Sequence, residues 1–364
     1  MERGIVTARQ FAMLVVLFVI GDTILYLPAK IVQESQQNAW LSGLLGIAAG
    51  LVIVSVYGVL AGRYPRQHLL DMYGSAFGKL AGQALGWAAV LFFTLDSGIV
   101  LWQVGDFMVT HIMPETPIQS FLILFMAVVV WGYRLGLGTI VRSAEIFFYL
   151  VIFLFVVLIV LLIPEVEPKR LLPVFNKGAN PVLRGGVLLV GYYCEAFILM
   201  MLLPAVGSRR PIGGAYRIGM LTGSSVLAVT ILTCLLVLGA PVTGLQLFTS
   251  FVLAKKISIA DFLERIEVFM ASLWFLTLFV KLFLCFYAAV LGTTRLLKLK
   301  DDRVLSLPFA FLTVVSSFVI VPTSIYFNQF IQHTWWAFSA TFGLLIPVAM
   351  LGSAWVRSLS PVKK

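Results

Sequence analysis

Charged side chains are scarce in this chain of 364 residues. Aspartate, glutamate, lysine and arginine make up only 12% of it, whereas 60% is hydrophobic and the mean hydropathy is +1.02. Soluble domains contain about 25% charged residues, so these few charges could not cover the surface of a soluble fold of this length. The composition therefore excludes an ordinary soluble protein and predicts an integral protein of the lipid bilayer.

Cysteine and the common catalytic signatures are also rare or missing. The only three cysteines, Cys194, Cys234 and Cys285, lie in apolar stretches, and an odd number of buried thiols indicates neither a disulfide framework nor a zinc site. The sequence has no HExxH or GxSxG motif, and neither Gly-Asp pair has the preceding glycine of the Gly-x-Gly-Asp element of intramembrane aspartyl proteases. We therefore expect no enzyme activity, no cofactor and no metal site.

Ten apolar stretches are each long enough to cross the hydrocarbon core as a helix of about 20 residues. They are Gln10–Ile31, Trp40–Ala61, Ala84–Ile112, Ile118–Tyr133, Ile146–Ile163, Gly185–Val206, Ala215–Leu238, Phe262–Leu297, Leu305–Tyr326 and Trp335–Val356. The sequence thus predicts a single transmembrane domain over residues 1–364. Trp335 and Trp336 fall at a predicted span end, where interfacial tryptophans are common.

The basic residues predict the orientation of these spans. With the N-terminus in the cytoplasm, the cytoplasmic segments hold 17 lysines and arginines and the outer segments hold 7, as the positive-inside rule requires. An even number of spans then returns the C-terminus to the cytoplasm. The net charge of +10 is spread over short loops rather than along one stripe, so we expect no nucleic-acid partner.

A polar loop over residues 164–184 divides the spans into two sets of five, residues 1–163 and 185–357. An odd number of spans in each half makes the second half enter the membrane in the opposite sense. That is the pattern of an inverted repeat, which many secondary transporters contain. A ten-helix bundle without internal symmetry would give the same count, so this alternative stays open.

The first and sixth spans each combine a mid-span glycine with an acidic residue and a later proline. The first contains Gly21-Asp22 and Pro28, and the sixth contains Gly191, Glu195 and Pro204. A break in a helix frees backbone groups that lipid cannot satisfy but a polar ligand can. Helix N-termini attract a carboxylate, and free carbonyls and acids attract an ammonium group. The pattern favours a zwitterion site, although such glycines also serve simply for close helix packing.

Five charged residues lie within predicted spans: Asp22, Asp96, Asp106, Glu195 and Lys281. A charge at the bilayer centre costs about 2.5–3.5 kcal/mol on insertion scales and is a functional candidate by default. Lys281 could pair with Asp22 or Glu195, replace a bound sodium ion, or carry a transferable proton. A buried ion pair that only fixes the helix register is the alternative. Asp106 either lines a polar path or lies near the outer interface.

Several segments together are typical of one family of membrane proteins. Gly21-Asp22-Thr23-Ile24-Leu25-Tyr26-Leu27-Pro28 is similar to the "GTGILxLP" segment of the spore permease family, with Asp22 where much of the family has an uncharged residue. Further similar segments follow in the family's order: Tyr133-Arg134-Leu135-Gly136 with Arg142, Leu172-Pro173-Val174, Glu195 with Leu202-Leu203-Pro204, and Arg265-Ile266-Glu267 with Trp274 and Lys281. The resemblance covers nearly the whole chain.

This family comprises the B subunits of endospore germinant receptors, within the amino acid–polyamine–organocation superfamily. The resemblance implies an all-α polytopic membrane protein with a LeuT-like 5+5 inverted-repeat fold, whose broken helices 1 and 6 surround a midplane site. It also implies the inner spore membrane, A and C subunits as partners, and a small germinant, often an L-amino acid such as alanine, whose binding triggers germination. A proton-coupled amino-acid permease is the alternative function.

We expect the binding pocket to be formed by residues of four spans. The expected pocket residues are Gly21, Asp22 and Thr23 in the first span, Ser97, Gly98 and Trp102 in the third, Tyr192 and Glu195 in the sixth, and Tyr287 in the eighth. Lys281 and Asp106 are expected to be linked to an ion or a proton.

Overall fold

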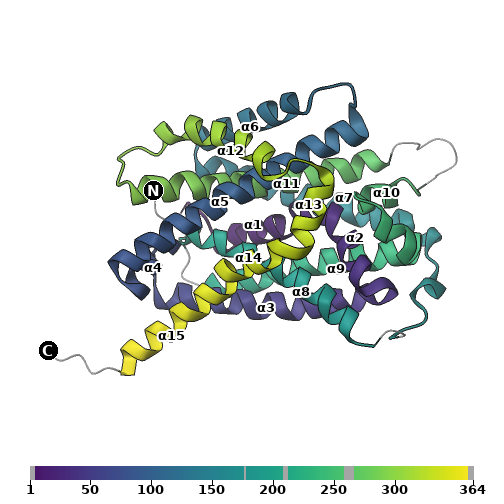
Figure 1. Ribbon diagram of the computed structural model, residues 1–364, viewed down its shortest axis with the longest axis horizontal. Coiled ribbons are helices and arrows are strands. Elements are labelled where there is room, and N and C mark those ends of the chain that lie inside the picture. The colour runs from purple at the N-terminus through teal and green to yellow at the C-terminus, as the bar shows by residue number, and fades with distance from the viewer. Residues whose placement is uncertain (1–4, 176–177, 208–211, 258–265, 360–364) are drawn as a thin grey trace.

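Long apolar segments in a bilayer must satisfy their backbone polar groups internally, and helices do this within one segment. The computed structural model describes residues 5–175, 178–207, 212–257 and 266–359, and nearly all of them are helical (Figure 1). The one β-type contact in these ranges is an isolated bridge between Val6 and Val206. The predicted all-α class is therefore confirmed.

The α-helices are α1 (Ala8–Ile20), α2 (Thr23–Ser35), α3 (Ala39–Arg63), α4 (Leu69–Phe77), α5 (Lys79–Phe107), α6 (Ile118–Leu135), α7 (Leu137–Leu162), α8 (Asn180–Cys194), α9 (Ile212–Leu245), α10 (Thr249–Ala254), α11 (Glu267–Leu296), α12 (Ser306–Ile320), α13 (Ser324–Phe330), α14 (Trp336–Ala340) and α15 (Ile346–Leu359). A 3₁₀-helix, η5 (Glu195–Ala205), continues α8. Two π-helical turns, Ile331–Trp335 and Thr341–Leu345, join α13, α14 and α15 into one segment.

Nine helical stretches of the described chain are long and apolar enough to cross a membrane, and α1 is a shorter apolar helix. One of the nine, Thr23–Arg63, contains both α2 and α3. With α1 and α2 taken as halves of one broken crossing, the elements account for the ten predicted spans. The polytopic class with an interrupted first and sixth span, as in a LeuT-like bundle, is confirmed, and the division into two repeats stays a prediction.

Several predicted span boundaries were wrong. The fifth span begins at Leu137 rather than Ile146, because Glu145 near its start is accommodated by a hydrogen bond from Gln10. The ninth span ends at Ile320, and the tenth begins at Ser324, eleven residues before its predicted start. The predicted start of the eighth span, Phe262, lies outside the described residues, as do Arg265 and several residues of the basic count.

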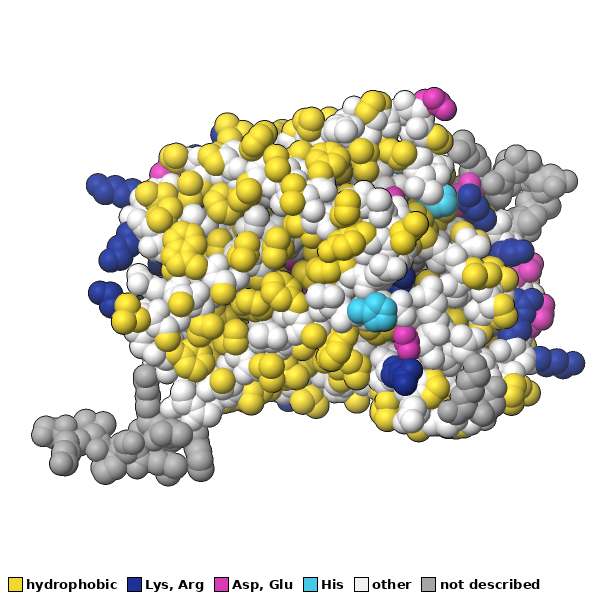
Figure 2. All heavy atoms as spheres, in the orientation of Figure 1, with side chains coloured by type: hydrophobic (Ala, Val, Ile, Leu, Met, Phe, Trp, Pro, Cys, Tyr) yellow, Lys and Arg dark blue, Asp and Glu magenta, His cyan; other side chains and the backbone are white. Residues whose placement is uncertain are grey.

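The helices pack so that the first and sixth spans lie inside the bundle. Helix α9 packs along α1, α2 and α3, α3 also packs on α8, and α5 packs on α11 and α12. The segment from α13 to α15 crosses the face of the bundle obliquely (Figure 1). Figure 2 shows this face covered with hydrophobic side chains, whereas Lys, Arg, Asp and Glu gather mostly toward its two ends. That distribution suits a protein with a lipid-facing belt between two polar surfaces.

A close backbone contact joins the tenth span to the sixth. A Cβ atom added to Gly343 would lie 2.2 Å from the carbonyl oxygen of Cys194. The hydroxyl of Tyr57, in the second span, donates to both carbonyls, at 3.1 Å from Cys194 O and 2.5 Å from Gly343 O. Three spans thus meet where α8 gives way to η5.

Substitution of Gly343 by alanine should therefore destabilise the protein. Overpacking of a tight contact costs about 1–3 kcal/mol, so Gly343→Ala should lower the apparent melting temperature of the purified protein by several degrees. Gly62→Ala is the matched control, because an added Cβ there meets nothing within 4 Å. Equal melting temperatures for the two variants would contradict this account of the contact.

Candidate functional site

The first span is broken at Gly21 and Asp22, as predicted. Helix α1 ends at Ile20, Gly21 has a φ of +25°, and α2 begins at Thr23. The Thr23 hydroxyl donates to the carbonyls of Val19 and Ile20, at 2.7 Å each. The break is encoded locally, because glycine tolerates a positive φ and the threonine side chain satisfies carbonyls at the end of α1.

The eighth span satisfies the backbone groups that the break exposes. On α11, the Thr277 hydroxyl donates to the Gly21 carbonyl at 2.9 Å, and the Trp274 indole N–H donates to the Asp22 carbonyl at 3.3 Å. These bonds fix the broken segment against α11 and supply the partners that lipid could not.

The sixth span is interrupted after Cys194, and not at the glycine that the sequence suggested. Helix α8 continues through Gly191 to Cys194, and the chain then winds as the 3₁₀-helix η5 past Pro204. A Cβ atom on Gly191 would lie 2.6 Å from the Cα atom of Trp336. At this position the close-packing alternative is therefore correct, and the interruption coincides with Glu195.

Lys281 lies between the two carboxylates that the helix breaks position. Its Nζ atom is 2.5 Å from Asp22 Oδ1 and 2.5 Å from Glu195 Oε2, and the side chains are only 1%, 7% and 2% exposed, respectively. A Cβ atom on Gly21 would lie 2.7 Å from Lys281 Cδ, so only glycine at this position leaves room for the lysine side chain. The structure thus pairs Lys281 with both acids. We call Asp22, Glu195 and Lys281 the charge triad.

The second oxygen of each triad carboxylate also has a donor. Gln103 Nε2 of α5 lies 2.9 Å from Asp22 Oδ2, and the indole N–H of Trp335 donates to Glu195 Oε1. Trp335 is only 2% exposed, so its predicted place at the membrane interface was wrong. All four carboxylate oxygens are hydrogen-bonded, as buried charges require.

The formal charges of the triad do not cancel. Two carboxylates face one ammonium group, and a further acid, Asp96 on α5, is buried beside them and accepts a hydrogen bond from the Cys285 thiol at 3.2 Å. Cys285 lies one helical turn after Lys281 on α11. An excess of negative charge in the bilayer interior is costly, so this region can accept a proton or another positive group.

Thr23 and Tyr192 are close in sequence to the triad acids, since Thr23 follows Asp22 and Tyr192 precedes Glu195 by three residues. Tyr192 is buried on α8, one turn before Glu195. The Thr23 hydroxyl is used by carbonyls of its own span.

Three predicted pocket residues make their contacts elsewhere. Ser97 donates to the Phe93 carbonyl of its own helix, and a Cβ on Gly98 would lie 2.5 Å from Ser316 Oγ of α12. Tyr287 lines a cavity of about 440 Å³ together with Arg295, Lys298 and other residues at one end of α11. These contacts do not place the three residues at the triad.

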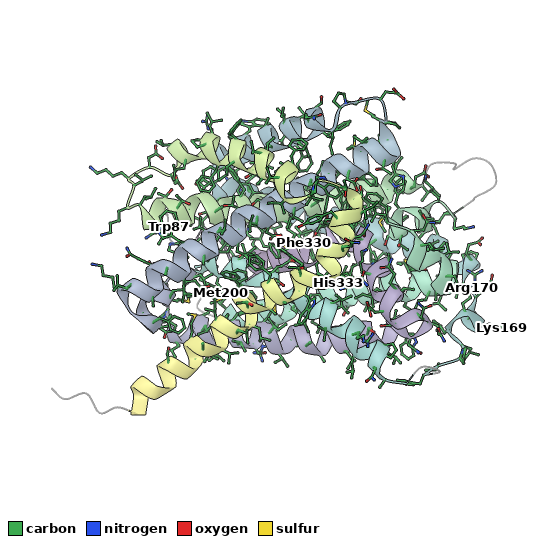
Figure 3. The ribbon with its side chains drawn as sticks, in the orientation of Figure 1. Trp87, Lys169, Arg170, Met200, Phe330 and His333 are labelled. Carbon is green, nitrogen blue, oxygen red and sulfur yellow. The ribbon has the colours of Figure 1, made fainter. Side chains whose placement is uncertain are left out.

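Trp102 and Asp106 lie in a different region, between α5 and α13. The Trp102 ring lies 5.0 Å from that of Phe327, which is also 5.4 Å from the ring of Tyr26 in α2. The Asp106 carboxylate accepts a hydrogen bond of 2.8 Å from Ser324. Figure 3 shows the same segment continuing through Phe330 and His333 across the middle of the bundle.

A buried histidine connects η5 to α11. His68 Nδ1 lies 2.8 Å from the Met201 carbonyl, and Nε2 lies 2.9 Å from an Arg295 guanidinium nitrogen. Burial lowers the pKa of His68, and the charge of Arg295 acts in the same direction. The ring is therefore neutral at pH 7, with Nδ1–H donating to Met201 and Nε2 accepting from Arg295.

Sequence reasoning missed the neutral partners of the triad. Gln103 is an amide within an apolar span, a signal that could have been noticed, since it lies one turn before Asp106. Trp274 entered only through the family resemblance and Trp335 only as an expected interfacial residue, and neither pattern pointed to the triad. Thr277 carried no signal, because threonine is an ordinary residue of membrane helices.

Removing the lysine alone should damage the protein more than removing the whole triad. Loss of one partner of a buried ion pair costs about 3–5 kcal/mol, whereas apolar or neutral replacements of a complete pair are often tolerated. We expect Lys281→Met to lower the apparent melting temperature strongly, and the triple variant Asp22→Asn, Glu195→Gln, Lys281→Met to recover most of the loss. Additive effects of the three substitutions would show that the groups do not act together.

Comparison with known proteins identifies relatives over most of the chain. A family model described as "Spore germination protein" matches residues 5–325. Spore germination protein KB of Bacillus subtilis (strain 168) is 26% identical over 88% of this chain and 86% of its own length. Spore germination protein YndE of the same organism is 24% identical over 85% of each chain, and spore germination protein XB of Bacillus anthracis is 19% identical over 94% of this chain and 96% of its own.

Among solved structures, a manganese transporter of Eremococcus coleocola aligns with 95% of this chain and 78% of its own, at 14% identity and a TM-score of 0.49.

The family match covers most of the sequence, including both helix breaks and the three residues of the charge triad. The chain therefore belongs to the spore permease family of spore germination proteins.

Proposed function

We propose that this protein is the B subunit of a spore germinant receptor, which binds a small germinant of the L-amino acid class and thereby triggers germination. The observation that carries the proposal is the Lys281 ammonium group, held between carboxylates from the two interrupted spans. Membership of the spore germination family supports the biological role.

A zwitterion can enter the charge triad without changing its net charge. The ligand ammonium group would replace Lys281 Nζ at Asp22 or Glu195, and the released lysine would pair with the ligand carboxylate. Each buried charge keeps an opposite partner throughout, whereas an anionic ligand alone would add to the excess of negative charge. This exchange supports an amino acid as the ligand.

Such an exchange would also provide a signal. Lys281 links α11 to α2 and η5, so its release by a ligand would loosen the first and sixth spans from the eighth. A ligand shifts a conformational equilibrium only by its differential affinity for the two states. Here the difference is the pair of ion contacts that the ligand makes only in the opened triad.

The proposal extends to the protein's surroundings. The bundle would lie in the inner spore membrane with both termini in the cytoplasm, beside the A and C subunits of the receptor. This orientation is supported by the 17 basic residues assigned to cytoplasmic segments against 7 assigned to outer ones.

A proton-coupled amino-acid permease is the second candidate. It is favoured by the unbalanced charge of the triad and Asp96, since a group that accepts a proton with its ligand can couple the two movements. Purified protein in liposomes would then accumulate labelled amino acid when a proton gradient is imposed. A receptor without transport would bind the amino acid and give no such accumulation.

Glu195→Gln tests the site directly. The amide cannot hold an ammonium group as the carboxylate does, so spores carrying the variant should need at least tenfold more germinant for half-maximal germination. The amino acid is identified first, as one whose response is lost in the deletion strain. Glu115→Gln is the control, because Glu115 is an exposed acid outside the spans. An unchanged response, with unchanged binding to purified protein, would remove Glu195 from the site.

A further inference from the structure

Four buried polar atoms near the C-terminal end of α5 have no hydrogen-bond partner among the described residues. They are Tyr26 Oη, Gln103 Oε1, Asp106 Oδ2 and Asn328 Oδ1. Tyr26 is 2% exposed, Gln103 is 1% and Asp106 is 8%. A buried polar atom without a partner costs about 1–3 kcal/mol, and more when it is charged, so four in one region require an explanation.

Hydrogen bonds and ring contacts connect these four residues, which come from three helices. Gln103 and Asp106 lie one turn apart on α5, and Gln103 bonds Asp22, which is one turn before Tyr26 on α2. Asp106 accepts from Ser324 at 2.8 Å, and Asn328 donates to the Ser324 carbonyl at 2.9 Å, both on α13. The Phe327 ring between Ser324 and Asn328 packs on Tyr26 and Trp102.

The four unpaired atoms are oxygens. For the two amides, the hydrogen bonds that their nitrogens make fix this assignment. Gln103 must turn its amide nitrogen toward the Asp22 carboxylate, and Asn328 must turn its nitrogen toward the Ser324 carbonyl. A flipped amide would place oxygen against oxygen in both cases. The region therefore offers two amide oxygens, one carboxylate oxygen and a phenol oxygen.

A group of oxygen ligands that includes only one carboxylate suits a monovalent cation. Divalent ions such as Ca²⁺ and Mg²⁺ favour sites with more carboxylates or with several retained waters. The triad carboxylates do not compete, because Lys281 already holds them. The rings of Trp102, Phe327 and Tyr26 add faces that attract cations once water is excluded.

We propose that Asp106, Gln103, Tyr26 and Asn328 form a binding site for a monovalent cation, separate from the charge triad. The cation is an alkali metal ion or the ammonium group of an organic ligand, which share the charge and the preference for oxygen. Binding at this site neutralises the Asp106 carboxylate and satisfies the four free oxygens. The proposal does not depend on the germinant-receptor function.

The test measures the thermal unfolding of the purified full-length protein in lipid nanodiscs. Sodium, potassium, rubidium and methylammonium chlorides are each titrated against N-methyl-D-glucamine chloride at constant ionic strength. A ligand that binds only the folded state raises the melting temperature saturably. We expect such a rise with at least one of the four cations. A rise with alkali ions only identifies an inorganic ion, and a rise with methylammonium only identifies an ammonium group.

Variants connect the effect to the four oxygens. Asp106→Asn should weaken the apparent cation affinity at least tenfold, and Tyr26→Phe, which keeps the aromatic packing, should weaken it about threefold or more. Asp71→Asn, at an exposed acid of α4, should leave it unchanged. The proposal is overturned if no cation gives a saturable rise, or if Tyr26→Phe and every Asp106 variant that folds retain the wild-type affinity.

A further variant separates this site from the proposed function. Glu195→Gln changes the charge triad but none of the four oxygens, so it should retain the cation effect. Loss of the germinant response in Glu195→Gln with a normal cation titration would support both sites. A normal germinant response in that variant would count against the triad and leave the cation site standing.

Discussion

The ammonium group of Lys281 between two carboxylates is the interaction on which the rest of the structure depends. Each of the three charges alone would be costly in a bilayer. They are tolerated together because Nζ lies 2.5 Å from an oxygen of each carboxylate. The contact requires the first, sixth and eighth spans to meet at one depth. It also requires Gly21, since any side chain there would collide with the lysine.

The features that the sequence predicted well are those that local chemistry decides. Ten apolar runs become membrane helices because lipid offers no other partner for their backbone. The break at Gly21 is local too, since a glycine with positive φ and a threonine that caps α1 lie next to each other. The acids and the lysine were found from their cost in the membrane alone. Their mutual pairing follows because buried charges must find partners.

The features that the sequence could not predict depend on contacts between distant segments. Gly191 and Gly21 look alike in the sequence, but Gly191 makes room for Trp336, about 145 residues later, and the helix continues through it. The sequence position of Trp335 is typical of an interfacial tryptophan, but in the folded protein its indole N–H donates to Glu195. In the same way, Ser97 and Gly98 lie on a span buried along most of its length, so its composition does not reveal which face borders the site.

The tenth span is the element that connects the two sites. At its start, the Ser324 hydroxyl donates to Asp106 and the Ser324 carbonyl accepts from Asn328, whereas Trp335, about three turns after Ser324, donates to Glu195 of the triad. A π-helical turn over Ile331–Trp335 lies between them, and such turns are frequent at functional sites. On the other side, Gln103 bonds Asp22 through its nitrogen and turns its oxygen away from it. The proposed cation site and the charge triad therefore share one helix and one amide side chain but no oxygen atom. Gln103 turns its nitrogen to the triad and keeps its oxygen for the cation, so each site holds its own charge with its own atoms.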